Sequence, residues 1–159
     1  YPSIIGRRME RPVINLGFSG NGRMDPPIVE RIATLNVSVY VIDCCPNMDP
    51  PLITERAEPL VKALRTARPD TPIVLVENVP YEKGWFLPAS KDAYVKKNEA
   101  LRAAYDRLKA SGMKKLYYIR CDDFWGDDHD ATVDGVHPND IGFLRMADAI
   151  ERELRKIVR

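Results

Sequence analysis

The feature that most constrains the fold is an alternation of short apolar segments with longer amphipathic ones. Apolar residues run through the short segments instead of occupying every second position, which is typical of strands buried on both faces. We expect strands at 12–18, 37–43, 71–79 and 115–120. Strands that alternate with helices predict a parallel sheet, joined by right-handed crossovers and covered by helices on both faces. The predicted class is therefore α/β.

Helical spacing of apolar residues and Gly or Pro stop signals set the expected helices. They lie near 1–10, 27–35, 53–67 and 91–109, with a last helix after Asn139. Pro59 must either begin the third helix or kink it. A chain of 159 residues without a linker or repeat is the size of one domain, so we expect residues 1–159 to form a single domain.

Composition excludes several classes of protein. The formal net charge is only +1, and Lys and Arg are scattered, so we expect no nucleic-acid partner. No apolar run is long enough to span a bilayer. The odd number of cysteines, Cys44, Cys45 and Cys121, argues against a disulfide framework and leaves the compartment open.

The carboxyl ends of parallel strands share one edge of the sheet, where ligands of open α/β sheets bind. The unusual loops of this chain all follow predicted strands and should therefore meet there. They are 19–21, 44–47, 78–88 and 120–137. Their aromatic residues suit either loop packing or contact with an acyl group or a sugar face. These residues are Tyr81, Trp85, Phe86, Phe124 and Trp125.

The sequence Asp134-Gly-Val-His137-Pro-Asn139 is the strongest candidate for chemistry. An Asp and a His three residues apart in a Gly/Pro turn can lie on one rim of a pocket. A carboxylate that holds one imidazole nitrogen leaves the other free to accept a proton from a nucleophile. A loop His whose turn alone satisfies it is the alternative interpretation.

Two other patterns have competing interpretations. The loop from Gly17 to Gly22 could cradle a phosphate, with Asp43 as a ribose ligand, but its spacing is G-x-x-G-x-G and 25–27 separates it from the next helix. The same loop could present a backbone N–H to an oxyanion. The run 127–130 (D-D-H-D) is more typical of solvated acidic residues than of a metal site, so we expect no metal and no cofactor.

Three segments resemble the second, third and fifth motifs of the SGNH, or GDSL-like, hydrolases. They are I-N-L-G-F-S-G-N at 14–21, V-I-D-C-C-P-N-M at 41–48 and V-D-G-V-H-P-N at 133–139. They occur in the order of the family, and the resemblance extends over essentially the whole chain.

The resemblance implies a serine esterase of flavodoxin-like three-layer form, acting on a small-molecule ester. In this interpretation His137 is the general base and acid, and Asp134 orients it. Gly20 offers its backbone N–H to the oxyanion and Asn47 its side-chain amide. The family's nucleophilic serine lies in a motif after the first strand, which this sequence lacks, so we expect it upstream of Tyr1; Ser19 is the alternative.

A missing first strand has a structural consequence. In the flavodoxin-like order it would lie between the segments 12–18 and 37–43, so its absence would leave a gap with unpaired backbone groups. We therefore expect an N-terminally truncated domain whose gap is closed by a separate segment, by the flanking strands, or by self-association. A non-catalytic carbohydrate-binding or scaffold domain and a nucleotide-binding domain remain alternatives to the esterase.

Overall fold

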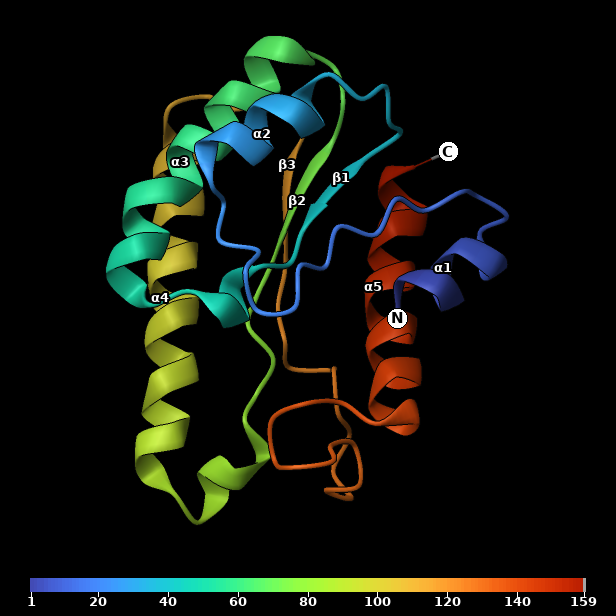
Figure 1. Cartoon of the computed structure of the whole chain (residues 1–159), viewed down its shortest axis with the longest axis vertical. Coiled ribbons are helices and arrows are strands. Elements are labelled where there is room, and N and C mark those ends of the chain that lie inside the picture. Colours follow the sequence, from blue (N-terminus) through green and yellow to red (C-terminus); the bar gives the residue numbers. More distant parts are fainter. Residues whose placement is uncertain (159) are drawn as a thin grey trace.

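A computed structural model describes residues 1–158 and contains a three-stranded parallel sheet in the order β1-β2-β3. The strands are β1 (Tyr40–Ile42), β2 (Ile73–Val76) and β3 (Leu116–Ile119). The helices are α1 (Pro2–Arg8), α2 (Pro26–Ala33), α3 (Pro50–Ala67), α4 (Pro88–Ala110) and α5 (Asp140–Ile157), with short 3-10 helices η1 (Cys45–Asn47) and η2 (Glu82–Trp85). The α/β class, with helices on both faces of the sheet, is confirmed (Figure 1).

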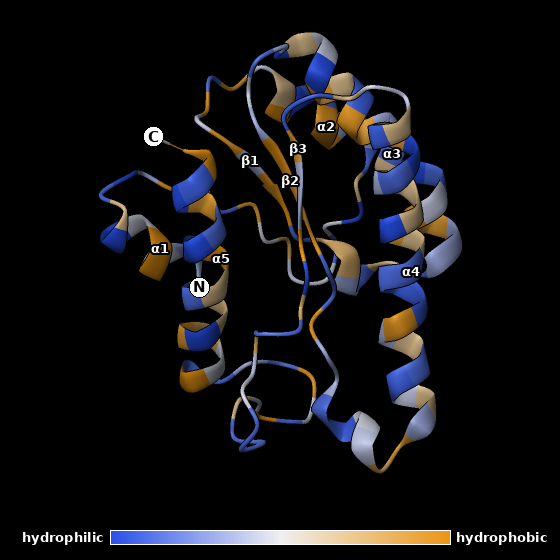
Figure 2. Ribbon diagram, turned by 180° about the vertical axis from the view of Figure 1, so that it is seen from behind, coloured by the Kyte–Doolittle hydropathy of each residue, from blue (hydrophilic) through white to orange (hydrophobic). Residues whose placement is uncertain are grey.

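The sheet is buried on both faces because its side chains alternate between two cores. Ile73 and Leu75 of β2 pack with α2, α3 and α4, whereas Val74 and Val76 pack with α1 and α5. Figure 1 shows these two helical layers on opposite sides of the strands. β1 and β2 are hydrophobic along their length, as Figure 2 shows. Burying apolar surface on both faces is what makes this three-layer arrangement stable.

Local sequence signals explain the helix boundaries. Asp49 caps α3 by accepting a hydrogen bond from the Leu52 N–H, at 2.9 Å. Pro59 lies inside α3. The helix expected from residue 91 begins three residues earlier, at Pro88, a residue that fits the first turn because its missing N–H needs no partner there. In α5, Met146 and Ile150 are buried as expected, but Phe143 is 37% exposed.

The prediction of a buried strand at 12–18 is wrong. This segment has no regular secondary structure, and its apolar side chains are exposed. A strand needs a neighbour to complete its hydrogen bonds, and among residues 1–158 the segment pairs with no strand. It crosses the molecule between β1 and α5 (Figure 1). A hollow of about 740 Å³ separates it from β1, whose only strand partner in the described chain is β2.

Candidate active site

The turn at 131–139 is built as a closed loop that leads into α5. Thr132 and Pro138 form an isolated antiparallel bridge, and the Asn139 N–H donates to the Ala131 carbonyl at 3.0 Å. The Asn139 side chain accepts from Gly142 N–H at 3.0 Å and so caps α5. The start of the last helix therefore fixes the base of the turn.

Asp134 organises the turn around His137. One carboxylate oxygen accepts the backbone N–H groups of Val136 and His137, at 2.9 and 2.8 Å. The other lies 2.8 Å from His137 Nδ1. Gly135 between them has a φ of +81°, a conformation that glycine adopts without strain. The sequence predicted this pair correctly as a contact because three residues of a tight turn bring both side chains to one rim.

The hydrogen bonds also set the charge of the pair. Those from the backbone and the ring of His137 hold the pKa of Asp134 well below its usual range. An ionised Asp134 favours the tautomer with the proton on Nδ1, so Nε2 is left to take a proton from a substrate or nucleophile. The His137 side chain is 76% exposed, which leaves that nitrogen accessible. The arrangement can act as a general base.

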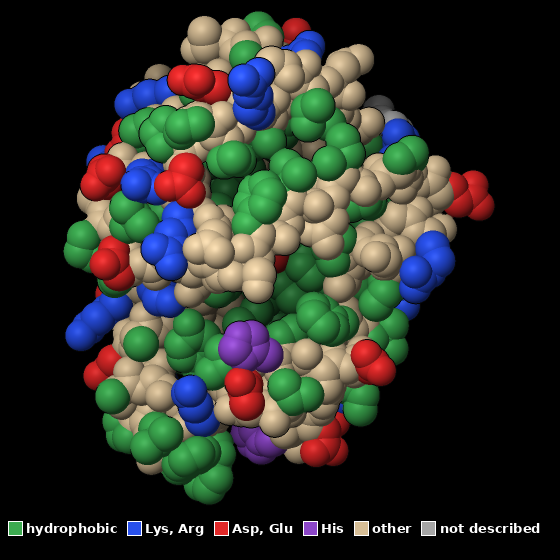
Figure 3. Space-filling view, viewed as in Figure 1, with side chains coloured by type: hydrophobic (Ala, Val, Ile, Leu, Met, Phe, Trp, Pro, Cys, Tyr) green, Lys and Arg blue, Asp and Glu red, His purple; other side chains and the backbone are tan. Residues whose placement is uncertain are grey.

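Asn47 is the last residue of η1, which follows β1 after Asp43 and Cys44, and it lines the hollow beside β1. Its side-chain Nδ2 is 3.4 Å from the Gly22 carbonyl oxygen. Gly20, two residues earlier, has a φ of +84° and open space where a Cβ would lie. The structure thus brings the 20–22 loop against Asn47, with Gly22 as the direct contact. Figure 3 shows a hollow lined with hydrophobic side chains and a histidine at its margin.

The predicted site residues form two groups. Asp134 and His137 are in contact, and Asn47 contacts the loop that carries Gly20. Within residues 1–158, however, no hydrogen bond joins His137 to Asn47 or Gly20, and none joins a serine hydroxyl to His137. Ser19 stands in a left-handed conformation, with a φ of 47°, in the exposed part of its loop.

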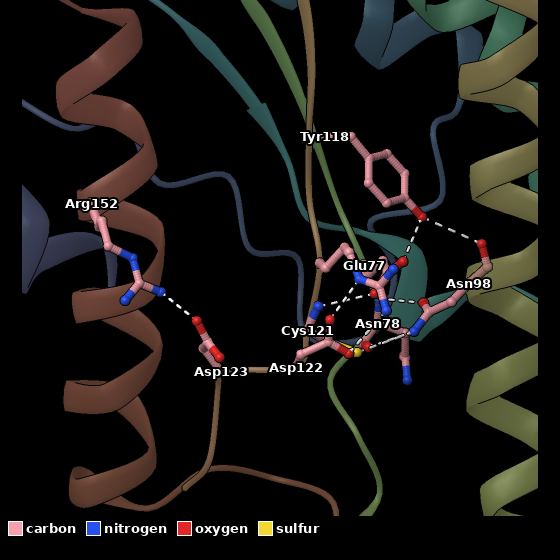
Figure 4. A network of polar contacts seen from close by, with 9 residues as sticks. Glu77, Asn78, Asn98, Tyr118, Cys121, Asp122, Asp123 and Arg152 are labelled. Carbon is pink, nitrogen blue, oxygen red and sulfur yellow. Dashed lines mark hydrogen bonds and ion pairs between the residues drawn. The ribbon is translucent and has the colours of Figure 1, made fainter.

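A buried polar network at the ends of β2 and β3 was missed by sequence reasoning (Figure 4). Asn98 of α4 accepts from the Asn78 N–H at 2.7 Å and donates to the Asn78 carbonyl at 3.1 Å. Glu77 accepts from the Tyr118 hydroxyl and from the Cys121 N–H, both at 2.9 Å. These bonds tie the loops that follow both strands to α4. The available signal was an asparagine on the apolar stripe of α4.

The aromatic residues divide into packing and surface positions. Phe124 and Trp125 are buried, and the Trp125 indole N–H donates to the Pro80 carbonyl at 2.7 Å, so these two hold loops together. Trp85 is 78% exposed and packs edge-on against Phe86, with ring centroids 5.0 Å apart. Of the five aromatic residues, Trp85 and Phe86 are therefore the exposed ones, and Tyr81 is half-buried.

The acidic run 127–130, the cysteines and the loop 17–22 are the remaining candidates for binding a ligand. Among the described residues, no group of three or more His, Cys, Asp or Glu side chains is placed to hold a metal ion. The cysteines are free thiols, and burial raises the pKa of Cys45 to about 12, which keeps it a protonated thiol. The loop 17–22 does not lead directly into α2, whose N-cap residue, Asp25, pairs with Arg56. An acidic residue at that position disfavours a phosphate.

No helix in the described part of the chain is long and apolar enough to cross a membrane.

The protein is thus an α/β domain with a parallel sheet and an Asp–His pair in the turn before its last helix. The sequence profile of the GDSL-like Lipase/Acylhydrolase family matches residues 1–155, and the chain belongs to this family. The search of curated proteins found no match.

Several solved structures are similar to this chain. A Bacteroides ovatus protein described as a GDSL-like lipase is 38% identical, with a TM-score of 0.95 over 99% of this chain and 47% of its own. A salicylyl-acyltransferase from a tetracycline biosynthetic pathway is 20% identical, with a TM-score of 0.83 over 99% of this chain and 50% of its own. A family two carbohydrate esterase from Clostridium thermocellum is 17% identical, with a TM-score of 0.70 over 97% and 52%. The chain thus spans about half the length of these structures, and the last two are similar in fold alone.

Proposed function

We propose that the protein is a serine esterase of SGNH type that hydrolyses a small acyl ester through a Ser-His-Asp mechanism. The observation that carries the proposal is the Asp134–His137 pair, with 2.8 Å between the carboxylate and Nδ1. This arrangement leaves His137 Nε2 exposed and able to accept a proton. A turn with a purely structural role would not require it.

In this mechanism the seryl hydroxyl attacks the ester carbonyl while His137 Nε2 removes its proton. Asp134 stabilises the imidazolium that forms. His137 then gives the proton to the departing alcohol, and water repeats the cycle on the acyl-enzyme. The Asn47 amide and the Gly20 N–H donate hydrogen bonds to the oxyanion, where each donor is typically worth about 10²- to 10³-fold in rate.

We place the nucleophilic serine outside the 159 residues. Two observations support this placement. In the described chain no serine hydroxyl is bonded to His137, and the related structures are about twice as long as this chain. Ser19 is the alternative within the chain, and its loop carries Gly20.

The substrate belongs to the small acyl esters. The similar structures include a salicylyl-acyltransferase and carbohydrate esterases, whose names denote the transfer of an acyl group and the hydrolysis of an ester. Acyl transfer to an alcohol and hydrolysis have the same first half-reaction. The exposed Trp85 and Phe86 suit the planar face of an aromatic acyl group or of a sugar.

The test uses the complete protein with acyl-nitrophenols and acetylated sugars as substrates. We expect His137→Ala to lose activity by at least 10³-fold, whereas His129→Ala, which changes the only other histidine, leaves it unchanged. Full activity in His137→Ala would refute the mechanism.

Fluorophosphonate labelling locates the nucleophile. We expect a single labelled serine outside the 159 residues, and labelling that Ser19→Ala abolishes would make Ser19 the nucleophile instead. A complete protein that neither labels nor hydrolyses any ester would point to a non-catalytic, carbohydrate-binding role.

A further inference from the structure

The two halves of the candidate site are connected only indirectly. Asn47 follows β1, and the Asp134–His137 pair lies in the turn before α5. Among residues 1–158 no hydrogen bond links one directly to the other. Acyl transfer requires the oxyanion donor and the base to keep a fixed separation, and an error of about 1 Å can cost 10²-fold in rate. Some other part of the molecule must therefore set that separation.

Lys97 of α4 holds the Asn47 side of the site. Its Nζ donates to the carbonyl oxygen of Pro46, the residue before Asn47, at 2.8 Å. The same ammonium group donates to the Tyr81 hydroxyl at 3.2 Å and lies 5.8 Å from the centre of the Tyr81 ring. Hydrogen bonds with a charged donor are about twice as strong as neutral ones. Lys97 therefore fixes two separate loops, one of which carries Asn47.

Glu82 and Lys83, the two residues after Tyr81, hold the turn that carries the Asp134–His137 pair. The Lys83 N–H donates to the Gly135 carbonyl at 3.2 Å, inside the Asp134–His137 turn. The Glu82 carboxylate accepts a hydrogen bond from the Thr132 hydroxyl. A Cβ on Gly135 would lie 2.7 Å from the Lys83 Cβ, so the two backbones approach too closely for any side chain at position 135.

We infer that Lys97 and the Tyr81–Lys83 segment form a brace that sets the distance between Asn47 and His137. The inference rests on the proposed function, since it assigns positioning roles within that site. Contact runs without a break from Pro46 through Lys97 to Tyr81, and from Glu82 and Lys83 to the histidine turn. Lys97, Glu82 and Thr132 are positioning residues, because none of them is placed against the reacting atoms.

The alternative is that these contacts only stabilise the fold. Two variants at opposite ends of the brace separate these interpretations. Lys97→Met keeps the aliphatic stem and removes both hydrogen bonds, and Thr132→Val keeps the shape and removes the hydroxyl. Lys96→Met is the matched control, because it changes the neighbouring, exposed lysine of α4. Lys97→Arg keeps a charged donor and should restore part of the effect.

The experiment measures ester hydrolysis and amide hydrogen exchange in the complete protein. We expect Lys97→Met to lower kcat about 10- to 100-fold, with KM changing less than threefold and Lys96→Met unchanged. Exchange at the Val136 and His137 amides, which are bonded to Asp134, should rise at least tenfold in Lys97→Met although position 97 does not contact them. The double variant that combines Lys97→Met with Thr132→Val should lose no more kcat than the more affected single variant, because both substitutions break the same connection.

Two results would overturn the brace. One is unchanged exchange at Val136 and His137 in Lys97→Met, and the other is fully additive losses in the double variant. Hydrogen exchange does not depend on catalysis, so it decides the brace even where no ester is hydrolysed. A protein with the exchange response and no esterase activity would keep the brace and refute the proposed function.

Discussion

Asp43 should make the folded protein less stable as the pH rises through the weakly acidic range. It lies at the end of β1, where its Oδ2 accepts a hydrogen bond from the Tyr1 hydroxyl, with 2.6 Å between the two oxygens. Its Oδ1 is buried and has no hydrogen-bond partner among the described residues. Burial raises the pKa of Asp43 from 3.8 to about 6, because the charged form loses its hydration.

The sign and size follow from proton linkage. A carboxyl group whose pKa is higher in the folded state binds its proton more tightly there, so folding is favoured at low pH. That advantage is lost as the pH rises from about 4 to about 6, and it changes little above. The shift is about two units, so the free energy of unfolding should fall by about 3 kcal/mol across this range.

The perturbation is Asp43→Asn, which keeps an oxygen to accept from Tyr1 and carries no charge at any pH. Urea unfolding of both proteins at pH 4, 5, 6, 7 and 8 gives the difference in unfolding free energy. We expect that difference to move by about 3 kcal/mol in favour of the variant between pH 4 and 7. Acids with a lowered pKa, such as Asp134, lose their stabilising effect only below this window.

Subtracting the unchanged protein from the Asp43→Asn variant cancels the titrations that the two share. The matched control is Asp92→Asn, at an exposed position of α4. Asp92→Asn should run parallel to the unchanged protein at every pH. A difference for Asp43→Asn that stays constant within about 0.5 kcal/mol from pH 4 to 8 would refute the reasoning, because the carboxylate would then be as well solvated folded as unfolded.

Three further predictions address other parts of the chain. Asn139→Ala removes the cap of α5 and the 2.6 Å bond to the Asp130 carbonyl, so urea unfolding should show a loss of about 1–2 kcal/mol; no loss would mean that water replaces the cap. Asn47→Ala should lower kcat of the complete protein about 10²- to 10³-fold with little change in KM, whereas a rise in KM alone would make Asn47 a substrate-binding residue. The 159-residue chain should self-associate through the hollow beside β1, which sedimentation at several concentrations would detect; a monomer at every concentration, with the 13–18 amides protected from exchange, would mean that the chain covers its own edge.

The sequence predicted the helices and three of four strands because their signals are local. The helical stripe of α3 and the apolar run of β2 depend on residues within a few positions of one another. The segment 12–18 has a similar apolar composition, yet it is exposed and irregular. Apolar composition indicates only that a segment can join a sheet. A strand also requires a neighbouring strand to pair with, and no short stretch of sequence encodes that neighbour.

The same distinction explains what was foreseen of the candidate site. Asp134 and His137 meet because a three-residue spacing in a turn permits it, so a motif could predict their contact. Lys97 carries no motif, and its bond to Pro46 spans 51 residues. Its role depends on how α4 packs between two loops, which is decided by the whole core. A contact between residues close in sequence can thus be predicted from their spacing, but a contact such as that of Lys97 becomes visible only once the helices and the sheet are assembled.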